Sequence, residues 1–332
     1  MNITKKLPDI MHTVNEYVDY INSQISAIKY PSHPAGLYEP VKYTIEAGGK
    51  RLRPMLLLAV ADALGVPMGM AANQALAIEM FHNFTLLHDD LMDRADMRHG
   101  KPTVHVKWDA ATAILSGDTM LTMAGMMVTR GLRDKSALDI LALFNDTAID
   151  VYEGQQKDMD FESRTDVTIE EYLDMISQKT GALIAAPCLM GAILANADED
   201  RRQAFNDFGK ALGKAFQLQD DWLDTYGDPA VFGKKIGGDI LNDKKTYLLI
   251  KALADSTGEQ KSELLSLMGT RSEEKIERVR AIYDATGAEA ACRKLIEEAT
   301  DEAIKAIERA ELSDKATEFF RTLAEKSLTR RS

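Results

Sequence analysis

The stretch Asp89-Asp90-Leu91-Met92-Asp93 and its counterpart Asp220-Asp221-Trp222-Leu223-Asp224 decide the fold. Each pentad ends a segment in which apolar residues recur at helical spacing, which predicts two core helices with acidic ends. In a helix the first and last Asp of a pentad lie on one face, about 6 Å apart along the axis. Three carboxylates so close together repel one another until cations bind, and hard divalent cations prefer oxygen ligands. The pentads therefore predict a helical protein that holds several Mg²⁺ ions with a polyphosphate between them.

The composition favours an all-helical fold. Hydrophobic residues make up 45% of the 332 residues and aromatic residues only 7%, with many Ala, Leu and Met and few β-branched runs. The formal net charge of −12 argues against a nucleic-acid partner and against adsorption to anionic lipid. Because nothing resembling a linker divides the chain, we expect one domain over 1–332, with a core at 38–254 and a charged, solvated helical cap at 255–332.

The sequence predicts a cytoplasmic protein. No apolar segment follows Lys5 and Lys6, so we expect no signal peptide. The longest uncharged run, 181–197, is short for a membrane span and is expected to be a buried core helix, without stable membrane insertion. Cys188 and Cys292 lack the spacing of a metal site and fit small buried side chains in a reducing compartment.

Hydrophobic periodicity and breaks at Gly or Pro predict the order of the helices. The expected helices are 4–28, 38–46, 55–64, 71–93, 108–132, 136–160, 168–178, 180–196, 201–224 and 242–254, followed by charged helices over 255–332. Loops are expected at 94–105, which holds Gly100 and Pro102, and at the Gly-rich stretch 225–240. Each acidic pentad thus stands directly before a loop.

Four stretches carry basic or polar residues that suit anionic ligands. They are Gly48-Gly49-Lys50-Arg51-Leu52-Arg53-Pro54, the segment His88 to His105 with Arg98, Gly100, Lys101, Pro102 and Thr103, the pair Lys179-Thr180, and Gln217 to Lys244. Over roughly 38–250 the chain resembles the trans-isoprenyl diphosphate synthases of the polyprenyl synthetase family, which includes farnesyl and geranylgeranyl diphosphate synthases. The resemblance implies an all-α isoprenoid-synthase-type helical bundle around a deep central cavity and a homodimer. It also implies a cluster of three Mg²⁺ ions, for which Mn²⁺ can substitute.

The resemblance implies a prenyltransferase that joins isopentenyl diphosphate head-to-tail to an allylic diphosphate. The allylic substrate loses its diphosphate, and the double bond of isopentenyl diphosphate attacks the carbocation. Metal ions and oriented cations neutralise the charge that develops on the leaving group. Mg²⁺ keeps few protein ligands and takes phosphate oxygens for the rest, which suits Asp89, Asp93 and Asp220 as direct ligands. Weaker metal ligands, or acceptors for Lys and water, are expected at Asp90, Asp221 and Asp224.

The basic residues are assigned by the same resemblance. Lys50 and Arg53, three apart on one side of a turn, resemble the pair that holds isopentenyl diphosphate. His82 lies two helical turns before Asp89 and is placed to reach the same diphosphate, although such a His also fits a buried core position. Arg98 resembles the Arg that clamps the allylic diphosphate through two hydrogen bonds. Further contacts to the leaving group or within the cavity are expected from Lys179, Thr180, Gln217, Lys234 and Lys244.

Two of these assignments need comment. The family usually has two Arg residues before Gly100, and here the second is His99. A neutral His lacks the permanent charge of Arg, so we expect weaker or pH-dependent binding of isopentenyl diphosphate rather than loss of activity. The assignment of Lys244 is open by one position, because Lys235 and Lys245 are alternatives.

Residues just before the first pentad are expected to set product length, because they line the cavity wall in the family. Thr85 lies one turn before Asp89, and Phe84 and Phe81 lie about 7.5 Å and 12 Å from Asp89 along the axis. An aromatic at position 84 resembles enzymes that make C15 to C20 products, although Phe84 also fits an ordinary core position. We therefore expect geranylgeranyl diphosphate as product, with farnesyl diphosphate next.

Three other functions remain open. A synthase of longer chains, C25 and above, is one alternative, although such enzymes tend to have a small residue at the position of Phe84. A class I terpene cyclase typically carries one such pentad and a later Asn/Ser/Glu metal motif, whereas this chain has two full pentads. A silent subunit of a heteromeric synthase should have lost acidic residues, and all six Asp are present here.

Overall fold

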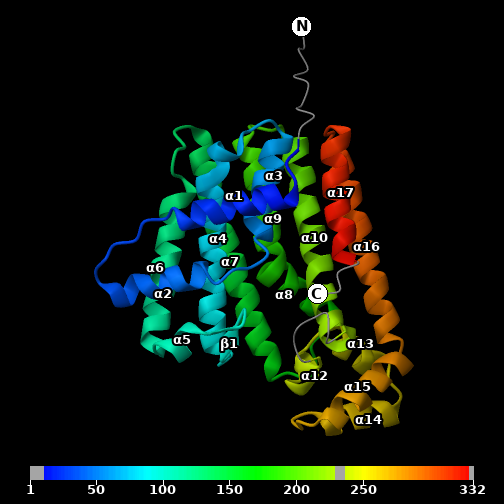
Figure 1. The fold of residues 1–332 in the computed structure, drawn as a ribbon. Helices are drawn as coiled ribbons and strands as arrows, with labels where there is room; N and C mark the ends of the chain where they lie inside the picture. Colours follow the sequence, from blue (N-terminus) through cyan, green and yellow to red (C-terminus); the bar gives the residue numbers. More distant parts are fainter. Residues whose placement is uncertain (1–10, 229–235, 329–332) are drawn as a thin grey trace. The chain divides into compact units, whose positions relative to one another are not determined.

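The computed structural model describes residues 11–228 and 236–328, and these are almost entirely helical (Figure 1). The expectation of an all-α protein is confirmed. The chain divides into two compact units, the first comprising Met1–Asp146, Ala186–Phe205 and Ala310–Ala316, and the second Thr147–Ala185, Asn206–Arg309 and Thr317–Ser332. The expectation of one domain around a central cavity stays a prediction.

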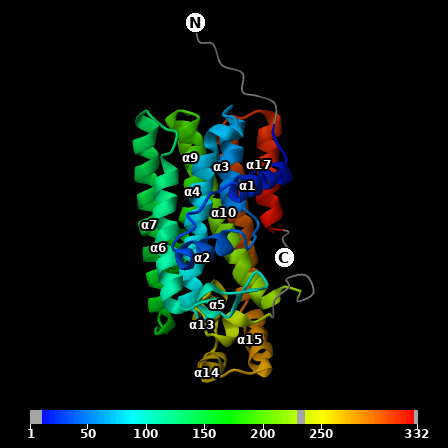
Figure 2. The ribbon, with the colours of Figure 1, turned by 60° about the vertical axis from the view of Figure 1, so that its left-hand side comes forward.

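The first unit combines upright helices with two helices that cross them. Its elements are α1 (Val14–Ser26), α2 (Ala35–Ile45), α3 (Leu52–Ala63), α4 (Met68–Met92), β1 (Met97–Arg98), β2 (Lys101–Pro102), α5 (Val104–Lys107) and α6 (Ala110–Val128). Figures 1 and 2 both show α4 and α6 side by side, with α1 crossing α3 and α4, and α2 crossing α4 and α6. The first pentad lies at the end of α4, next to the hairpin formed by β1 and β2.

Helix α4 is the centre of the first unit because most of its circumference is apolar and buried. Phe81, Phe84 and Leu87 are all at most 5% exposed. Gly117 allows α6 to approach closely, since a Cβ at this position would lie only 2.2 Å from Nε2 of His88 on α4. The first pentad is therefore carried on a closely packed support.

The second unit contains the remaining helices. They are α8 (Ile169–Ile176), the π-helical turn η1 (Ser177–Gly181), α12 (Gly238–Leu241), α13 (Tyr247–Asp255), α14 (Gly258–Leu267), α15 (Glu273–Ala285) and α16 (Ala288–Arg309). Four helices have residues in both units: α7 (Lys135–Glu162), α9 (Ala182–Leu194), α10 (Glu199–Tyr226) and α17 (Asp314–Leu328).

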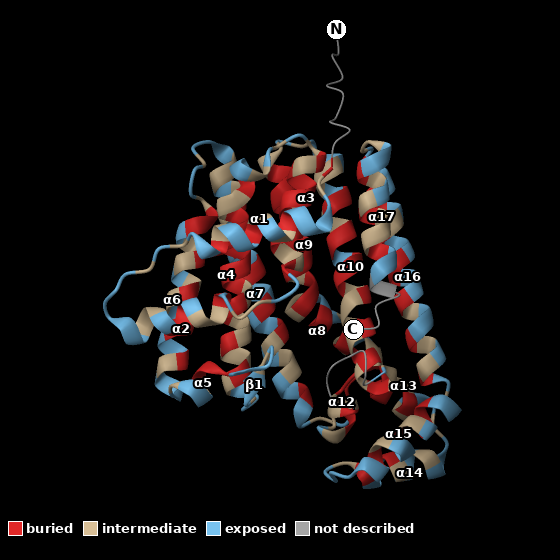
Figure 3. Ribbon diagram, viewed as in Figure 1, coloured by how far each residue is buried: buried red, intermediate tan, exposed pale blue. Residues whose placement is uncertain are grey.

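The C-terminal segment is more than a solvated cap. Val279 on α15 and Ile296 on α16 belong to the same buried cluster as Tyr172 on α8 and Leu218 on α10. The opposite faces of α15 and α16 are exposed, as the alternation of buried and exposed turns in Figure 3 shows. These amphipathic helices therefore help to hold the helix that carries the second pentad.

Observed and expected boundaries differ at several places. The helices expected at 168–178 and 180–196 are joined by η1, so no break separates them. The loop expected at 94–105 contains the β1–β2 hairpin and the start of α5, and α13 begins at Tyr247 rather than at 242. Helix α1 begins at Val14, and the expected positions 4–10 and 229–235 lie outside the described residues.

Two further observations concern the cellular compartment. Cys188 and Cys292 are buried and form no disulfide with each other. Of the described helices, α6 alone is long and apolar enough to cross a membrane by length and composition, and 39% of it is buried. The expected core helix α9, by contrast, does not pass that test. A cytoplasmic location and the lack of membrane insertion stay predictions.

Candidate active site

The residues from Gly48 to Arg51 form a tight turn before α3, so that Lys50 stands just before the helix and Arg53 in its first turn. Gly48 and Gly49 have φ values of 103° and 129°, which favour glycine because it lacks a Cβ. No side chain caps α3, and its first turn holds no acidic residue. Since a helix N-terminus attracts anions, Lys50 and Arg53 stand at a suitable place to bind a diphosphate.

His82 lies beside Arg53. Its Nε2 is 3.1 Å from Nη1 of Arg53, which donates to it. Burial, together with the charges of Arg53 and Arg98, holds the pKa of His82 well below its usual value. His82 is therefore neutral and orients Arg53 through this hydrogen bond, which is consistent with the predicted diphosphate site.

The carboxylates of the first pentad face different surroundings. Asp90 is buried and accepts a hydrogen bond of 2.7 Å from Nε of Arg98. Burial raises the pKa of Asp90, and the charge of Arg98 offsets part of that effect. Asp93 is exposed, Asp89 is half-buried, and the two lie one turn apart, where the amide of Asp93 donates to the carbonyl of Asp89. Asp90 thus positions Arg98, while Asp89 and Asp93 are accessible.

The β1–β2 hairpin places His99 near the glycine turn. Arg98 pairs with Lys101, so His99 and Gly100 form the tip, with φ values of 49° and 73°. A Cβ at Gly49 would lie 4.0 Å from Nε2 of His99. His99 therefore lies close to the segment that holds Lys50 and Arg53, and its effect on the binding of isopentenyl diphosphate stays a prediction.

The residues predicted to set product length are packed within the first unit. The ring of Phe84 lies 4.8 Å from that of His88 and 5.5 Å from that of Phe81. The hydroxyl of Thr85 donates to the carbonyl of His82 at 2.8 Å. These contacts place all three side chains one to two turns before the pentad, and their role in product length stays a prediction.

In the second unit, Asp221 is the anchor of the second pentad. It is buried and accepts hydrogen bonds from the hydroxyl of Tyr172 at 2.6 Å and from Nε2 of Gln217 at 2.8 Å. The hydroxyl of Thr180 donates to Oε1 of Gln217 at 2.7 Å. Two predicted residues, Thr180 and Gln217, therefore support Asp221 through one continuous network.

The carboxylates around this pentad also surround Lys244. Asp224 accepts a hydrogen bond of 2.8 Å from the amide of Asp239, and Lys244 lies 3.9 Å from the carboxylate of Asp239. Burial raises the pKa of both Asp221 and Asp239 to about 6. Burial alone would lower the pKa of Lys244, but Asp239, Asp221 and further carboxylates outweigh it and raise this pKa above its usual value. Lys244 is therefore a permanent cation among acids.

Lys179 lies within the π-helical turn η1. Its Nζ lies 2.5 Å from the carboxylate of Asp158 on α7. Gly154 makes room for the turn, since a Cβ there would lie 2.3 Å from the amide nitrogen of Lys179. A π-turn inserts one residue into a helix and is frequent at functional sites. Lys234, which was predicted to contact the same leaving group, lies outside the described residues.

Three residues of these networks were not among the predicted ones: Asp158, Tyr172 and Asp239. Asp158 lies in a charged stretch of α7 and looks like part of a solvated face. Tyr172 shares the apolar face of α8 and looks like an ordinary core residue. Asp239 could have been predicted as a site residue, because it follows Gly237-Gly238 shortly after the second pentad.

The available carboxylates fit Mg²⁺ that arrives with a phosphate. Within residues 11–228 and 236–328, no three His, Cys, Asp or Glu side chains form a metal site by themselves. Mg²⁺ in proteins is commonly bound by one or two carboxylates plus substrate phosphates. Asp89 and Asp93, on one face at the end of α4, supply such a pair. This donor set does not require a closed metal cage.

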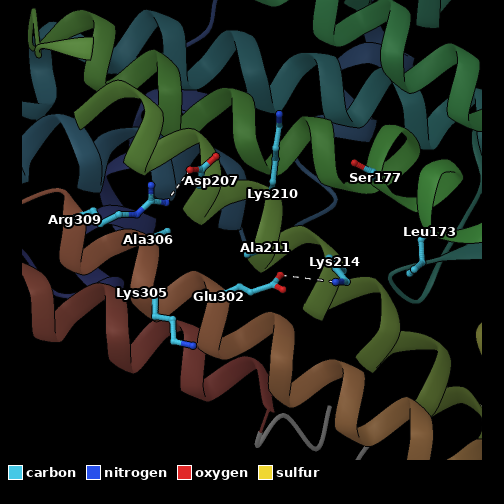
Figure 4. A pocket seen from close by; sticks show the side chains of 10 residues that line it. All are labelled: Leu173, Ser177, Asp207, Lys210, Ala211, Lys214, Glu302, Lys305, Ala306 and Arg309. Atoms are coloured by element: carbon cyan, nitrogen blue, oxygen red, sulfur yellow. Dashed lines mark hydrogen bonds and ion pairs between the residues drawn. The ribbon is translucent and has the colours of Figure 1, made fainter. Parts of the chain in front are cut away.

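A separate groove of about 420 Å³ lies between α8, α10 and α16 (Figure 4). Two ion pairs connect α10 with α16 across it, Asp207 with Arg309 at 2.7 Å and Lys214 with Glu302 at 3.7 Å. Figure 4 shows the side chains of Lys210 and Lys305 pointing away from each other. The groove contains none of the predicted site residues, and its charges do not converge on one point.

Comparisons with known proteins identify the family of the chain. Residues 34–286 match the polyprenyl synthetase family. The short chain isoprenyl diphosphate synthase of Methanothermobacter thermautotrophicus is 37% identical over 280 residues, which cover 84% of this chain and 86% of that one. The geranylfarnesyl diphosphate synthase of Natronomonas pharaonis is 36% identical over 256 residues, which cover 72% and 75%. A solved geranylgeranyl pyrophosphate synthase is similar with a TM-score of 0.92 and 41% identity, covering 97% of this chain and 100% of that one.

The family match and the alignments with these relatives each span most of the chain, and this establishes the family. The chain therefore belongs to the polyprenyl synthetase family and is a prenyl diphosphate synthase.

Proposed function

We propose that this chain catalyses the Mg²⁺-dependent 1'-4 condensation of isopentenyl diphosphate with an allylic diphosphate, with the C20 geranylgeranyl diphosphate as its main product. The observation that carries the proposal is the presence of two sets of side chains that suit a diphosphate, one at the start of α3 and one beside the first pentad. Lys50, Arg53 and neutral His82 gather at the uncapped start of α3, while Arg98 is held against the first pentad by Asp90. Two diphosphate substrates require two such sets, whereas a cyclase needs one.

The chain's own residues divide the work of ionisation. When bound, Mg²⁺ supplies Lewis acidity that neutralises the departing diphosphate. Asp89 and Asp93 would hold it from the first pentad and Asp220 from the second, and Mn²⁺ would fit the same oxygen ligands. Arg98, fixed by Asp90, and Lys179, fixed by Asp158, would each stabilise negative charge on a diphosphate without reorganising. Three ions remain the expected number.

Lys244 and the network of Asp221 have a supporting role in this proposal. A cation surrounded by carboxylates keeps them from repelling one another before Mg²⁺ and substrate bind. Lys234 would contact the leaving group as well. Thr180 and Gln217 hold Asp221 in place, so that Asp220, the adjacent residue, is presented on a fixed helix.

In this proposal the residues that precede the first pentad on α4 limit the length of the product. Phe84 and Phe81 form a buried aromatic pair in this region, which supports a short product. The names of the relatives span C20 and C25 products, geranylgeranyl and geranylfarnesyl diphosphate. C20 is therefore the proposed product, with C15 and C25 as the neighbouring lengths.

We also propose that the protein acts as a cytoplasmic homodimer without membrane insertion. Helix α6 exposes three large apolar side chains, Ile114, Leu115 and Met126, at 48%, 59% and 62%. Its other face is already buried against α4. A second copy that covers the exposed face accounts for an apolar helix on a strongly acidic protein without a lipid bilayer.

One experiment separates this function from its alternatives. Purified protein is incubated with Mg²⁺, isopentenyl diphosphate and an allylic diphosphate, and the products are analysed before and after phosphatase treatment. A prenyl diphosphate longer than the allylic substrate, absent with EDTA, is the expected result. A hydrocarbon formed from the allylic substrate alone would identify a cyclase, and the absence of any product would identify a silent subunit.

A further inference from the structure

A buried ion pair connects the cationic turn before α3 to helix α4. Nη1 of Arg51 lies 2.5 Å from Oε1 of Glu79, and the two side chains are only 2% and 4% exposed. Arg51 also donates through Nη2 to the carbonyl of Ile45 at 2.8 Å and through Nε to Oδ1 of Asn22 at 3.2 Å. One guanidinium therefore joins the turn to α1, the end of α2 and α4.

Glu79 has a second partner on its own helix. Its Oε1 accepts a second hydrogen bond, of 3.0 Å, from Nδ2 of Asn83 one turn later on α4. The carboxylate is thus fixed by both its own helix and Arg51. A pair of well-packed apolar side chains would hold the fold about as well, because burying two charges costs solvation. Apolar packing is not directional, whereas the hydrogen bonds of Arg51 and Glu79 fix the orientation of the turn relative to α4.

Buried Arg51 lies in the sequence between Lys50 and Arg53, the two residues assigned to the diphosphate. Arg51 has a left-handed backbone, with φ of 50°, and is the residue before the first turn of α3. That conformation is unfavourable for a side chain with a Cβ. It separates Lys50 from Arg53, and Arg53 in turn contacts His82. Helix α4 therefore contacts this segment through two side chains that are three residues apart on α4. Glu79 binds Arg51, and His82 binds Arg53.

Helix α4 also carries the first pentad, so it relates the turn to the metal ligands. Glu79 precedes Asp89 by ten residues and His82 precedes it by seven, which correspond to about 15 Å and 10 Å along a helix. Both attachment points and the pentad belong to the same continuous helix. The cations of the turn consequently have a fixed distance from Asp89.

We propose that Arg51, through Glu79, is a positioning residue that sets the place of the isopentenyl diphosphate group relative to the first pentad. Arg51 itself does not touch substrate in this account. It holds Lys50 and Arg53 where the attacking substrate must be anchored. The inference rests on the proposed function, because it assigns that substrate to the turn.

The experiment uses full-length protein and steady-state kinetics with each substrate varied in turn. In Arg51→Met/Glu79→Leu both charges are removed together, so no unpaired charge is left buried. We expect the KM for isopentenyl diphosphate to rise at least tenfold, the KM for the allylic diphosphate to change less than twofold, and kcat at saturation to be largely kept. Arg51→Lys keeps the charge but replaces three separate donor nitrogens in a planar fork by a single nitrogen, so it is expected to raise the same KM by a smaller factor.

Gln74→Met is the matched control. Gln74 is a buried polar residue on α4 that donates to the carbonyls of Val128 and Arg130, away from the turn. Its loss should lower the melting temperature and leave the ratio of the two KM values unchanged.

An unchanged KM for isopentenyl diphosphate in both Arg51 variants would overturn the inference, as would an equal rise in both KM values. If the double variant does not fold, Arg51→Lys alone decides by the same criterion. If the unaltered enzyme makes no prenyl diphosphate, the proposed function fails instead.

Discussion

Replacing Tyr172 by Phe removes one hydroxyl that the structure connects directly to the second pentad. That hydroxyl donates to Oδ2 of Asp221 at 2.6 Å inside the core of the second unit. The ring remains to fill its space, so the change leaves packing intact. Of the side-chain hydrogen bonds to Asp221 within residues 11–228 and 236–328, the one from Gln217 remains.

The expected loss of activity follows from the strength of the hydrogen bond between Tyr172 and the carboxylate of Asp221. A hydrogen bond to a charged group contributes about 1.5–3 kcal/mol, and about 1.4 kcal/mol corresponds to a factor of ten in rate. If the orientation of the pentad matters only when the diphosphate leaves, kcat should fall about 10- to 100-fold, with small changes in both KM values. Losing a donor to the ionised form also raises the pKa of Asp221 further above about 6.

The assay is steady-state turnover between pH 6 and 9 at several Mg²⁺ concentrations. We expect the acid limb of the kcat profile to move to higher pH in Tyr172→Phe, and the Mg²⁺ requirement to rise. Tyr283→Phe is the control, because Tyr283 is another buried tyrosine of the same core, and in the part of the chain that the structure describes the side-chain donors to Asp221 are Tyr172 and Gln217. Equal kcat and an unshifted pH profile in the Tyr172 variant would refute the view that this hydroxyl orients the pentad.

Three further predictions concern other parts of the protein. Phe84→Ala should lengthen the product beyond C20, and it should destabilise the fold by about 3–5 kcal/mol because a buried ring is lost; an unchanged product distribution would remove Phe84 from the cavity floor. His99→Arg should abolish most of the pH dependence of the KM for isopentenyl diphosphate between pH 6 and 8, since only the His gains charge as pH falls; identical profiles for both proteins would contradict this. Leu115→Glu should convert a dimer to a monomer in light scattering after size exclusion, whereas a variant that stays dimeric would place the interface elsewhere.

The features that sequence alone could predict were those encoded by local spacing. The pentads, the Gly48-Gly49 turn and the Lys179-Thr180 pair are each contiguous, so their residue types and helical periodicity are visible in one short window. Helix α4 was expected at 71–93 and is found at Met68–Met92 for the same reason. Fold class and most helix boundaries follow from such windows.

The features that sequence could not predict depend on single residues far apart in the chain. Arg51 and Glu79 are 28 residues apart, Asp158 and Lys179 are 21 apart, and Tyr172 lies 49 residues from Asp221. No periodicity connects these partners, because each is fixed by tertiary packing. The turn η1 escaped prediction as well, since an inserted π-turn has no composition of its own and depends on how closely α7 approaches at Gly154.

The most direct test of the proposed activity is product analysis with three allylic primers. The protein is incubated with Mg²⁺, labelled isopentenyl diphosphate and a C5, C10 or C15 allylic diphosphate, and the dephosphorylated products are separated by chain length. We predict that the same C20 alcohol dominates from all three primers and that none forms with EDTA. Products dominated by C30 and longer chains, or a hydrocarbon in place of a prenyl diphosphate, would contradict it.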